Sequence, residues 1–163
     1  MLISVIISLV ILLTYVVWTS ITYGVPDSIS QSYYSLKWNP LFTIVIWTTT
    51  ALITPPLMES AEPTQIVPFL GIFGLFLVGA APRVRDYDRV IHIIGACMAG
   101  IFSQLWIALY GNPWTLSMLL LPVGLMIWYG LDEEETMESV NFVFWTEITC
   151  YLSVYYNLIL KFV

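Results

Sequence analysis

The side chains best suited to chemistry lie in two places along the 163-residue chain. In the first, Asp88 and His92 are four residues apart and therefore share one face of any helix that begins there. A carboxylate and an imidazole on one face can bind a divalent metal or act as a catalytic proton-transfer pair. The alternative is structural: Asp88 complements the dipole at the helix start, and His92 lies at a membrane interface.

A metal site at this position has few ligands available. His92 is the only histidine in the chain, so a closed zinc site lacks its usual ligand set. We therefore expect no resident metal and no other cofactor. Asp88 and His92 remain the candidate ligands should a metal bind.

The second place is the segment "FWTEITCYLSVYYN", residues 144–157. Glu147 lies about 10–12 Å inside the predicted helix at 1.5 Å per residue, and an ionisable group at that depth in a membrane normally faces the protein interior. With Asp88 and His92 it completes the candidate catalytic set. A polar stripe also falls within about 120° of the helix surface at 100° per residue. Its members are Thr146, Glu147, Cys150, Ser153 and Asn157. The stripe lines a binding pathway or forms hydrogen bonds to neighbouring helices, and both interpretations stay open.

A matching polar surface is predicted in the segment 41–57. Thr43, Trp47, Thr50 and Thr54 recur at helical spacing and share one face. We take Thr50, together with the stripe of residues 144–157, as a candidate substrate-binding residue. The pair Pro55-Pro56 should loosen or end this helix, because proline lacks the backbone N–H and clashes with the preceding turn.

Composition indicates that these segments are membrane helices. Hydrophobic residues make up 59% of the chain and charged residues 10%, against roughly 25% charged in soluble domains. Apolar runs this long, without period-2 alternation, favour helices over a β-barrel. We predict an all-α, polytopic membrane protein formed by one six-helix bundle domain. The predicted spans are about 1–23, 41–57, 66–81, 90–110, 114–129 and 140–162.

Small residues predict which spans pack closely. The span 66–81 contains Gly71, Gly74 and Gly79, and the span 90–110 carries a face of glycine and alanine. Because small residues let membrane helices approach each other, these two spans should form a tight pair. His92 and Glu147 enter from the same membrane side, which leads to the hypothesis that they meet in one polar pocket.

The basic residues predict the orientation. Lys37, Arg83, Arg85 and Arg89 all follow odd-numbered spans, whereas Lys161 belongs to the opposite side. Since Lys and Arg resist translocation, the richer side should be cytoplasmic, with both termini non-cytoplasmic in an inner or plasma membrane. The first span lacks the basic n-region and cleavage site of a secretory signal and is expected to be retained.

The connection "GVPDSISQSYYSLKWNP", residues 24–40, is predicted to contain a short interfacial helix. Ile29, Tyr33 and Leu36 would share its apolar face, with Tyr34 and Trp38 as interface anchors. The acidic segment "DEEETME", residues 132–138, argues against nucleic acid as a partner.

The order of motifs resembles the Frag/DRAM-type six-helix membrane proteins. The resemblance covers mainly residues 71–102, through "GLFLVGAAP" followed by "RVIHIIGACMAGIF". It implies a six-helix bundle, in a family whose activity is poorly defined.

Three functions fit these observations. The preferred one is a bundle that binds or passes a small solute, ion or lipid headgroup. The second is a membrane-embedded hydrolase-type enzyme that uses Asp88, His92 and Glu147. The third is an assembly subunit in which the polar stripe contacts another chain. The expected partners are membrane lipids and either a second copy or another membrane protein.

Overall fold

The structure is a computed structural model that describes residues 1–81, 88–130 and 141–163. Within these ranges it is all-helical with no strand, which confirms the all-α part of the predicted fold class. The elements are α1 (Leu2–Tyr23), α2 (Ser32–Ser35), α3 (Pro40–Ser60), α4 (Ile66–Ala80), α5 (Asp88–Tyr110), the 3-10 helix η2 (Pro113–Leu119), α6 (Leu120–Gly130) and α7 (Phe142–Phe162).

Three of these helices are long and apolar enough to cross a membrane: Leu2–Tyr23, Pro40–Ser60 and Arg89–Tyr110. Two further apolar stretches, Ile66–Ala80 and Pro113–Trp128, are shorter. α7 has 21 residues but carries Glu147, Asn157 and Lys161 and is not among the three. Length and composition therefore fit a membrane location for the three long helices.

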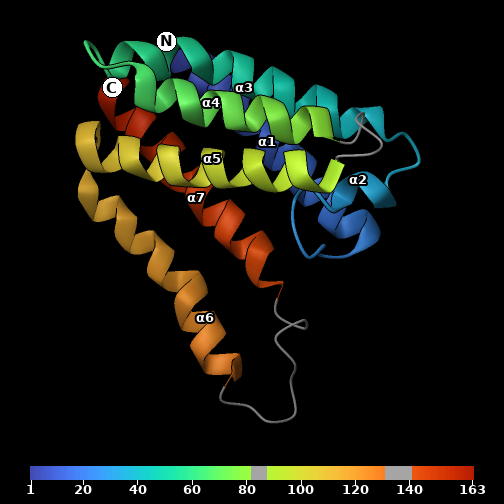
Figure 1. The fold of residues 1–163 in the computed structure, drawn as a ribbon. Coiled ribbons are helices and arrows are strands. Elements are labelled where there is room, and N and C mark those ends of the chain that lie inside the picture. Colours follow the sequence, from blue (N-terminus) through green and yellow to red (C-terminus); the bar gives the residue numbers. More distant parts are fainter. Residues whose placement is uncertain (82–87, 131–140) are drawn as a thin grey trace.

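The helices pack as consecutive neighbours (Figure 1). α4 packs between α3 and α5, α1 lies against α3 and α7, and α6 diverges from the other helices. Both termini lie at one end of the bundle, which we call the termini end. The opposite end, where α1 finishes and α3, α5 and α7 begin, is called the loop end.

Glycines hold α4 and α5 in close contact. A Cβ atom at Gly74 would lie 2.5 Å from the backbone nitrogen of Ala99, and one at Gly95 would lie 2.8 Å from the carbonyl oxygen of Gly74. No side chain fits at such distances, so the two backbones approach as the small residues predicted. One wall of the bundle is therefore closed tightly.

α3 differs from the sequence prediction at its prolines. The pair was expected to loosen or end the helix; the helix continues through Pro55 and Pro56 to Ser60, so the second of these alternatives was wrong. Ile53, Pro56 and Leu57 are buried in the core, and this packing stabilises the helical conformation of the segment. In membrane helices proline is tolerated where neighbouring groups compensate for the lost hydrogen bond.

The connection between α1 and α3 folds against the loop end. Ile29 and Leu36 are 3% and 5% exposed, while Tyr34 is 68% exposed, which confirms the predicted apolar face. The helix itself is shorter than predicted, with the four residues of α2. The hydroxyl groups of Tyr15 and Ser32 form a hydrogen bond of 2.6 Å that fixes α2 to α1.

Some sequence predictions fall outside the described residues. These are the roles of Arg83 and Arg85 in orientation and of the acidic segment 132–138. Lys37 and Arg89 are described, and both are exposed at the loop end.

Candidate functional site

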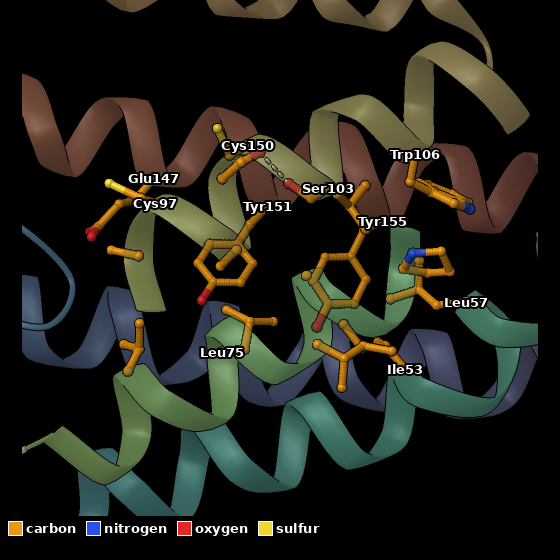
Figure 2. A pocket seen from close by; sticks show the side chains of 18 of the residues that line it. Ile53, Leu57, Leu75, Cys97, Ser103, Trp106, Glu147, Cys150, Tyr151 and Tyr155 are labelled. Carbon is orange, nitrogen blue, oxygen red and sulfur yellow. Dashed lines mark hydrogen bonds between the residues drawn. The ribbon is translucent and has the colours of Figure 1, made fainter. Parts of the chain in front are cut away.

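A cavity of about 310 Å³ lies between α3, α4, α5 and α7 (Figure 2). This volume is at the lower end of the range of about 300–1,000 Å³ that is typical of small-molecule sites. Most of the wall is apolar. It includes Ile53, Leu57, Ile72, Leu75, Trp106 and Val154. The polar character expected of the bundle interior is confined to a few side chains of α5 and α7.

Among the described residues that line the cavity, Glu147 provides the only Asp, Glu, Lys, Arg or His side chain. Its Oε2 accepts a hydrogen bond of 2.6 Å from the backbone N–H of Ile29. Its Oε1 accepts no hydrogen bond from any group in the described part of the chain. One carboxyl oxygen is therefore fixed by the protein, and the other is available to a ligand.

Two tyrosines of α7, one helical turn apart, project into the same space (Figure 2). Tyr155 Oη forms a hydrogen bond of 2.6 Å with Ser8 Oγ, which in turn donates to the carbonyl oxygen of Thr49 at 2.9 Å. Within residues 1–81, 88–130 and 141–163, the Tyr151 hydroxyl has no such partner. Tyr155 thus connects helices, whereas Tyr151 offers an unused hydroxyl.

A segment that we call the strap, residues 25–30, fixes the start of α7. The carbonyl oxygen of Val25 accepts a hydrogen bond of 3.1 Å from Asn141 Nδ2, and that of Asp27 accepts one of 3.0 Å from the backbone N–H of Phe144. The Asp27 carbonyl thus satisfies one of the backbone N–H groups that a helix start leaves unpaired. Together with the bond from Ile29 to Glu147, these contacts position the first turns of α7.

The strap also relates His92 to Glu147. His92 Nε2 and Ser30 Oγ form a hydrogen bond of 3.0 Å, and Ser30 follows directly after Ile29. Bond lengths across two adjacent residues then limit the separation of the imidazole and the carboxylate to about 13 Å or less. The two groups therefore lie at the same end of the bundle, but His92 is not among the residues that line the cavity.

The arrangement of the candidate ligands in the described residues does not form a metal site. Among the described residues, no three side chains of His, Cys, Asp or Glu are close enough together to hold a metal ion. The side chain of Asp88 lies outside the described part of the structure. Of His92 and Glu147, the two candidate catalytic residues whose side chains are described, only Glu147 lines the cavity.

The polar stripe of α7 divides into two parts. Thr146, Glu147 and Cys150 line the cavity at the loop end. Asn157, nearer the termini end, donates to Thr115 Oγ1 at 2.7 Å and accepts from the backbone N–H of Asn112 at 2.5 Å. Ser153 is buried, donates to the carbonyl oxygen of Cys150 and lies 3.4 Å from Gln104 Oε1. The second part therefore forms contacts between helices.

Thr50 is also placed away from the cavity. It is buried, and its hydroxyl donates to the carbonyl oxygen of Ile46 within α3. Its neighbours on the predicted polar face bind α4: Thr43 Oγ1 donates to Gly79 O at 2.9 Å, and Trp47 Nε1 donates to Phe76 O at 3.2 Å. This face therefore serves helix packing.

Sequence reasoning missed Tyr151 and Cys97 as cavity residues. Tyr151 lies four residues after Glu147, a spacing that could have indicated a shared helix face. Cys97 contributes to the wall from α5 and is also exposed at the surface. The strap carries no recognisable sequence signal, since it acts mainly through backbone groups.

Fold and site together define an all-helical protein with three helices suited to a membrane and an internal, mainly apolar cavity. Comparison of the chain with protein-family models, curated proteins and solved structures finds no match.

Proposed function

We propose that this chain is an integral membrane protein that binds a small amphiphilic molecule from the bilayer in the cavity between α3, α4, α5 and α7. The observation that supports the proposal is the combination of an apolar wall with the Glu147 carboxyl group at the loop end. Such a site suits a molecule with an apolar part and a polar head, because apolar lining supplies affinity and a few polar groups fix orientation.

The surface exposure of two cavity residues supports entry between α5 and α7. Cys97 of α5 and Val143 of α7 both line the cavity, and both are exposed, Val143 to 53%. In a bilayer this surface would face acyl chains, so an amphiphile would enter sideways without crossing water.

The proposal includes six crossings of the membrane, formed by α1, α3, α4, α5, the pair η2 and α6, and α7. An even number of crossings agrees with the position of both termini at one end (Figure 1). Lys37 and Arg89 at the loop end favour a cytoplasmic location for that end, and the termini are then non-cytoplasmic. The membrane would be an inner or plasma membrane.

Glycine substitutions provide the test of binding. A Cβ atom at Gly100 meets no heavy atom within 4 Å, and Gly100 lines the cavity. Gly100→Phe should therefore fill the cavity without disturbing the packing around it. Gly124→Phe is the matched control, because Gly124 has equally open space but belongs to α6 and does not line the cavity.

The probes are dodecylamine, dodecanol and dodecanoate, added to protein purified in a maltoside detergent. Native mass spectrometry measures the fraction of protein that carries one probe molecule. We expect at least one probe to bind to wild type and to Gly124→Phe and not to Gly100→Phe. The proposal would be contradicted if folded wild type bound none of the three probes. It would also be contradicted if Gly100→Phe bound a probe as well as wild type does.

One observation favours a second function, a hydrolase-type activity. The strap contacts both Glu147 and His92 through adjacent residues, Ile29 and Ser30. A carboxylate and an imidazole at one end of a cavity can transfer protons during hydrolysis. Hydrolysis of 4-nitrophenyl dodecanoate by wild type and its loss in both Glu147→Gln and His92→Gln would support this function. Equal hydrolysis by all three proteins would exclude these residues from it.

A further inference from the structure

We infer that the head group of the bound amphiphile is a cationic hydrogen-bond donor, of the class of a primary alkylammonium, that lies against Glu147. The inference rests on the proposed function and specifies which molecules the cavity takes. It depends on three features of the described residues: the charge of the lining, the unused acceptors, and the distribution of polar groups along the cavity.

Within the described ranges, one residue carries the charge of the lining. It is Glu147, the only acidic or basic side chain among the described lining residues, and its fixed oxygen accepts from a neutral backbone N–H. Arg89 and Lys37 lie at the same end but do not contribute to the wall. A carboxylate in a medium of low dielectric is costly unless an opposite charge accompanies it. A cationic ligand supplies that charge, whereas an anionic ligand would add repulsion.

The unused hydrogen-bonding groups favour a donor. Glu147 Oε1 and Tyr151 Oη have no hydrogen-bond partner within the described ranges. The two residues are four apart on α7, so their side chains leave the same helix face about 6 Å apart at Cβ. An ammonium group carries three N–H donors and no acceptor, so it can donate to a carboxylate oxygen and to a hydroxyl oxygen at the same time.

The remainder of the cavity suits a hydrocarbon chain. In Figure 2 Glu147 and Cys97 lie towards one side of the cavity, and Leu57 and Trp106 lie towards the other. Trp106 Nε1 already donates to Ser60 Oγ at 3.0 Å. Tyr155 Oη is likewise engaged, with Ser8. The far side therefore offers apolar surface and no free polar group from these two residues.

The test compares three ligands of equal chain length that differ in the head group. Dodecylamine, dodecanol and dodecanoate are titrated separately into wild type, Glu147→Gln and Glu59→Gln, with native mass spectrometry as the readout. Glu147→Gln keeps an oxygen that accepts from Ile29 N–H while it removes the charge. Glu59→Gln makes the same chemical change at an exposed site outside the cavity.

We expect dodecylamine to bind wild type and Glu59→Gln about tenfold more tightly than dodecanol, the effect of one charge-assisted hydrogen bond, with dodecanoate weakest. In Glu147→Gln this preference should disappear. Equal binding of amine and alcohol to wild type would overturn the inference and leave the proposed function intact. A preference that persists in Glu147→Gln would overturn the assignment to Glu147. Absence of all three ligands would instead contradict the proposed function.

Discussion

The two halves of α7 carry similar polar side chains and use them differently. Towards the termini end, Asn157 binds η2 and the segment before it through Thr115 and the Asn112 backbone N–H. Towards the loop end, Glu147 and Tyr151 face a cavity and keep groups that no described residue engages. Polar residues of one helix therefore serve both packing and the lining of a cavity, and the neighbouring elements decide which.

The position of α5 relative to α7 accounts for the difference. Ser153 and Gln104 bring α5 and α7 into contact at 3.4 Å in the middle of the bundle. At the loop end the wall opposite α7 consists of small residues of α5, such as Ala96 and Gly100. Small side chains leave space there that larger ones would fill. The strap holds Glu147 at that end of the cavity through the backbone N–H of Ile29.

The largest loss of stability is expected for a substitution at the contact between α4 and α5. In Gly74→Val the added Cβ would lie 2.5 Å from the Ala99 backbone nitrogen, so the helices must separate. We expect destabilisation of about 3 kcal/mol or more, at the upper end of the cost of overpacking. Thermal unfolding in detergent measures it. Gly100→Val is the control, because its Cβ meets open space. If Gly74→Val and Gly100→Val lost the same stability, the distinction between the packed contact at Gly74 and the open space at Gly100 would be contradicted.

The second-largest loss of stability is expected for a substitution of Asn157, where α7 packs against η2. Asn157→Leu removes hydrogen bonds to Thr115 Oγ1, to Ser153 O and from the Asn112 backbone N–H. We expect a loss of about 2 kcal/mol in the free energy of unfolding, with buried partners left unpaired. Tyr156→Phe, an exposed change on the same helix, is the control. A stable Asn157→Leu protein with altered probe binding would place Asn157 in the binding region instead.

A smaller difference in the free energy of unfolding is expected between variants of the two cavity tyrosines, Tyr151 and Tyr155. Tyr155→Phe loses the hydrogen bond to Ser8 and should cost about 1 kcal/mol. Tyr151→Phe loses a hydroxyl with no described partner, and its effect should stay within about 0.5 kcal/mol. Chemical denaturation of the two variants side by side measures the difference. A larger cost at Tyr151 would show that its hydroxyl is already engaged.

The smallest effect on stability is expected for Glu147→Gln. The amide oxygen can still accept from the Ile29 N–H, so the change in the free energy of unfolding should be within about 0.5 kcal/mol. Glu147→Ala removes that acceptor and should cost about 1–2 kcal/mol. Thermal unfolding of both variants distinguishes the roles. Equal destabilisation by Gln and Ala would indicate that the charge itself holds the strap.

The helical fold was largely predictable, because long apolar runs and their polar breaks specify helices directly. The close pairing of α4 and α5 was predictable as well, since glycine has few other uses inside such runs. Pro55 and Pro56 do not end α3, although a local rule allowed it, because Ile53 and Leu57 beside them are buried in the helical segment.

The candidate site was predictable only in part. Glu147 and Asn157 both fall within the predicted polar stripe of about 120°, and their different roles follow from long-range contacts that periodicity does not encode. The strap acts through the Ile29 backbone N–H, a group present in nearly every residue type. No pattern of side chains could have indicated it.

Cysteine reactivity along α7 tests the central claim most directly. In a Cys97→Ser background Cys150 is the only thiol, and it lines the cavity. In a Cys97→Ser/Cys150→Ser background, Ser153→Cys places the only thiol at a fully buried packed position. Mass spectrometry follows modification by N-ethylmaleimide in lipid nanodiscs at alkaline pH. We expect Cys150 to react about tenfold faster or more, because opening the packed position costs at least about 1.4 kcal/mol. Equal rates, or faster reaction at position 153, would contradict the division of α7 into residues that line the cavity and residues that pack against neighbouring helices.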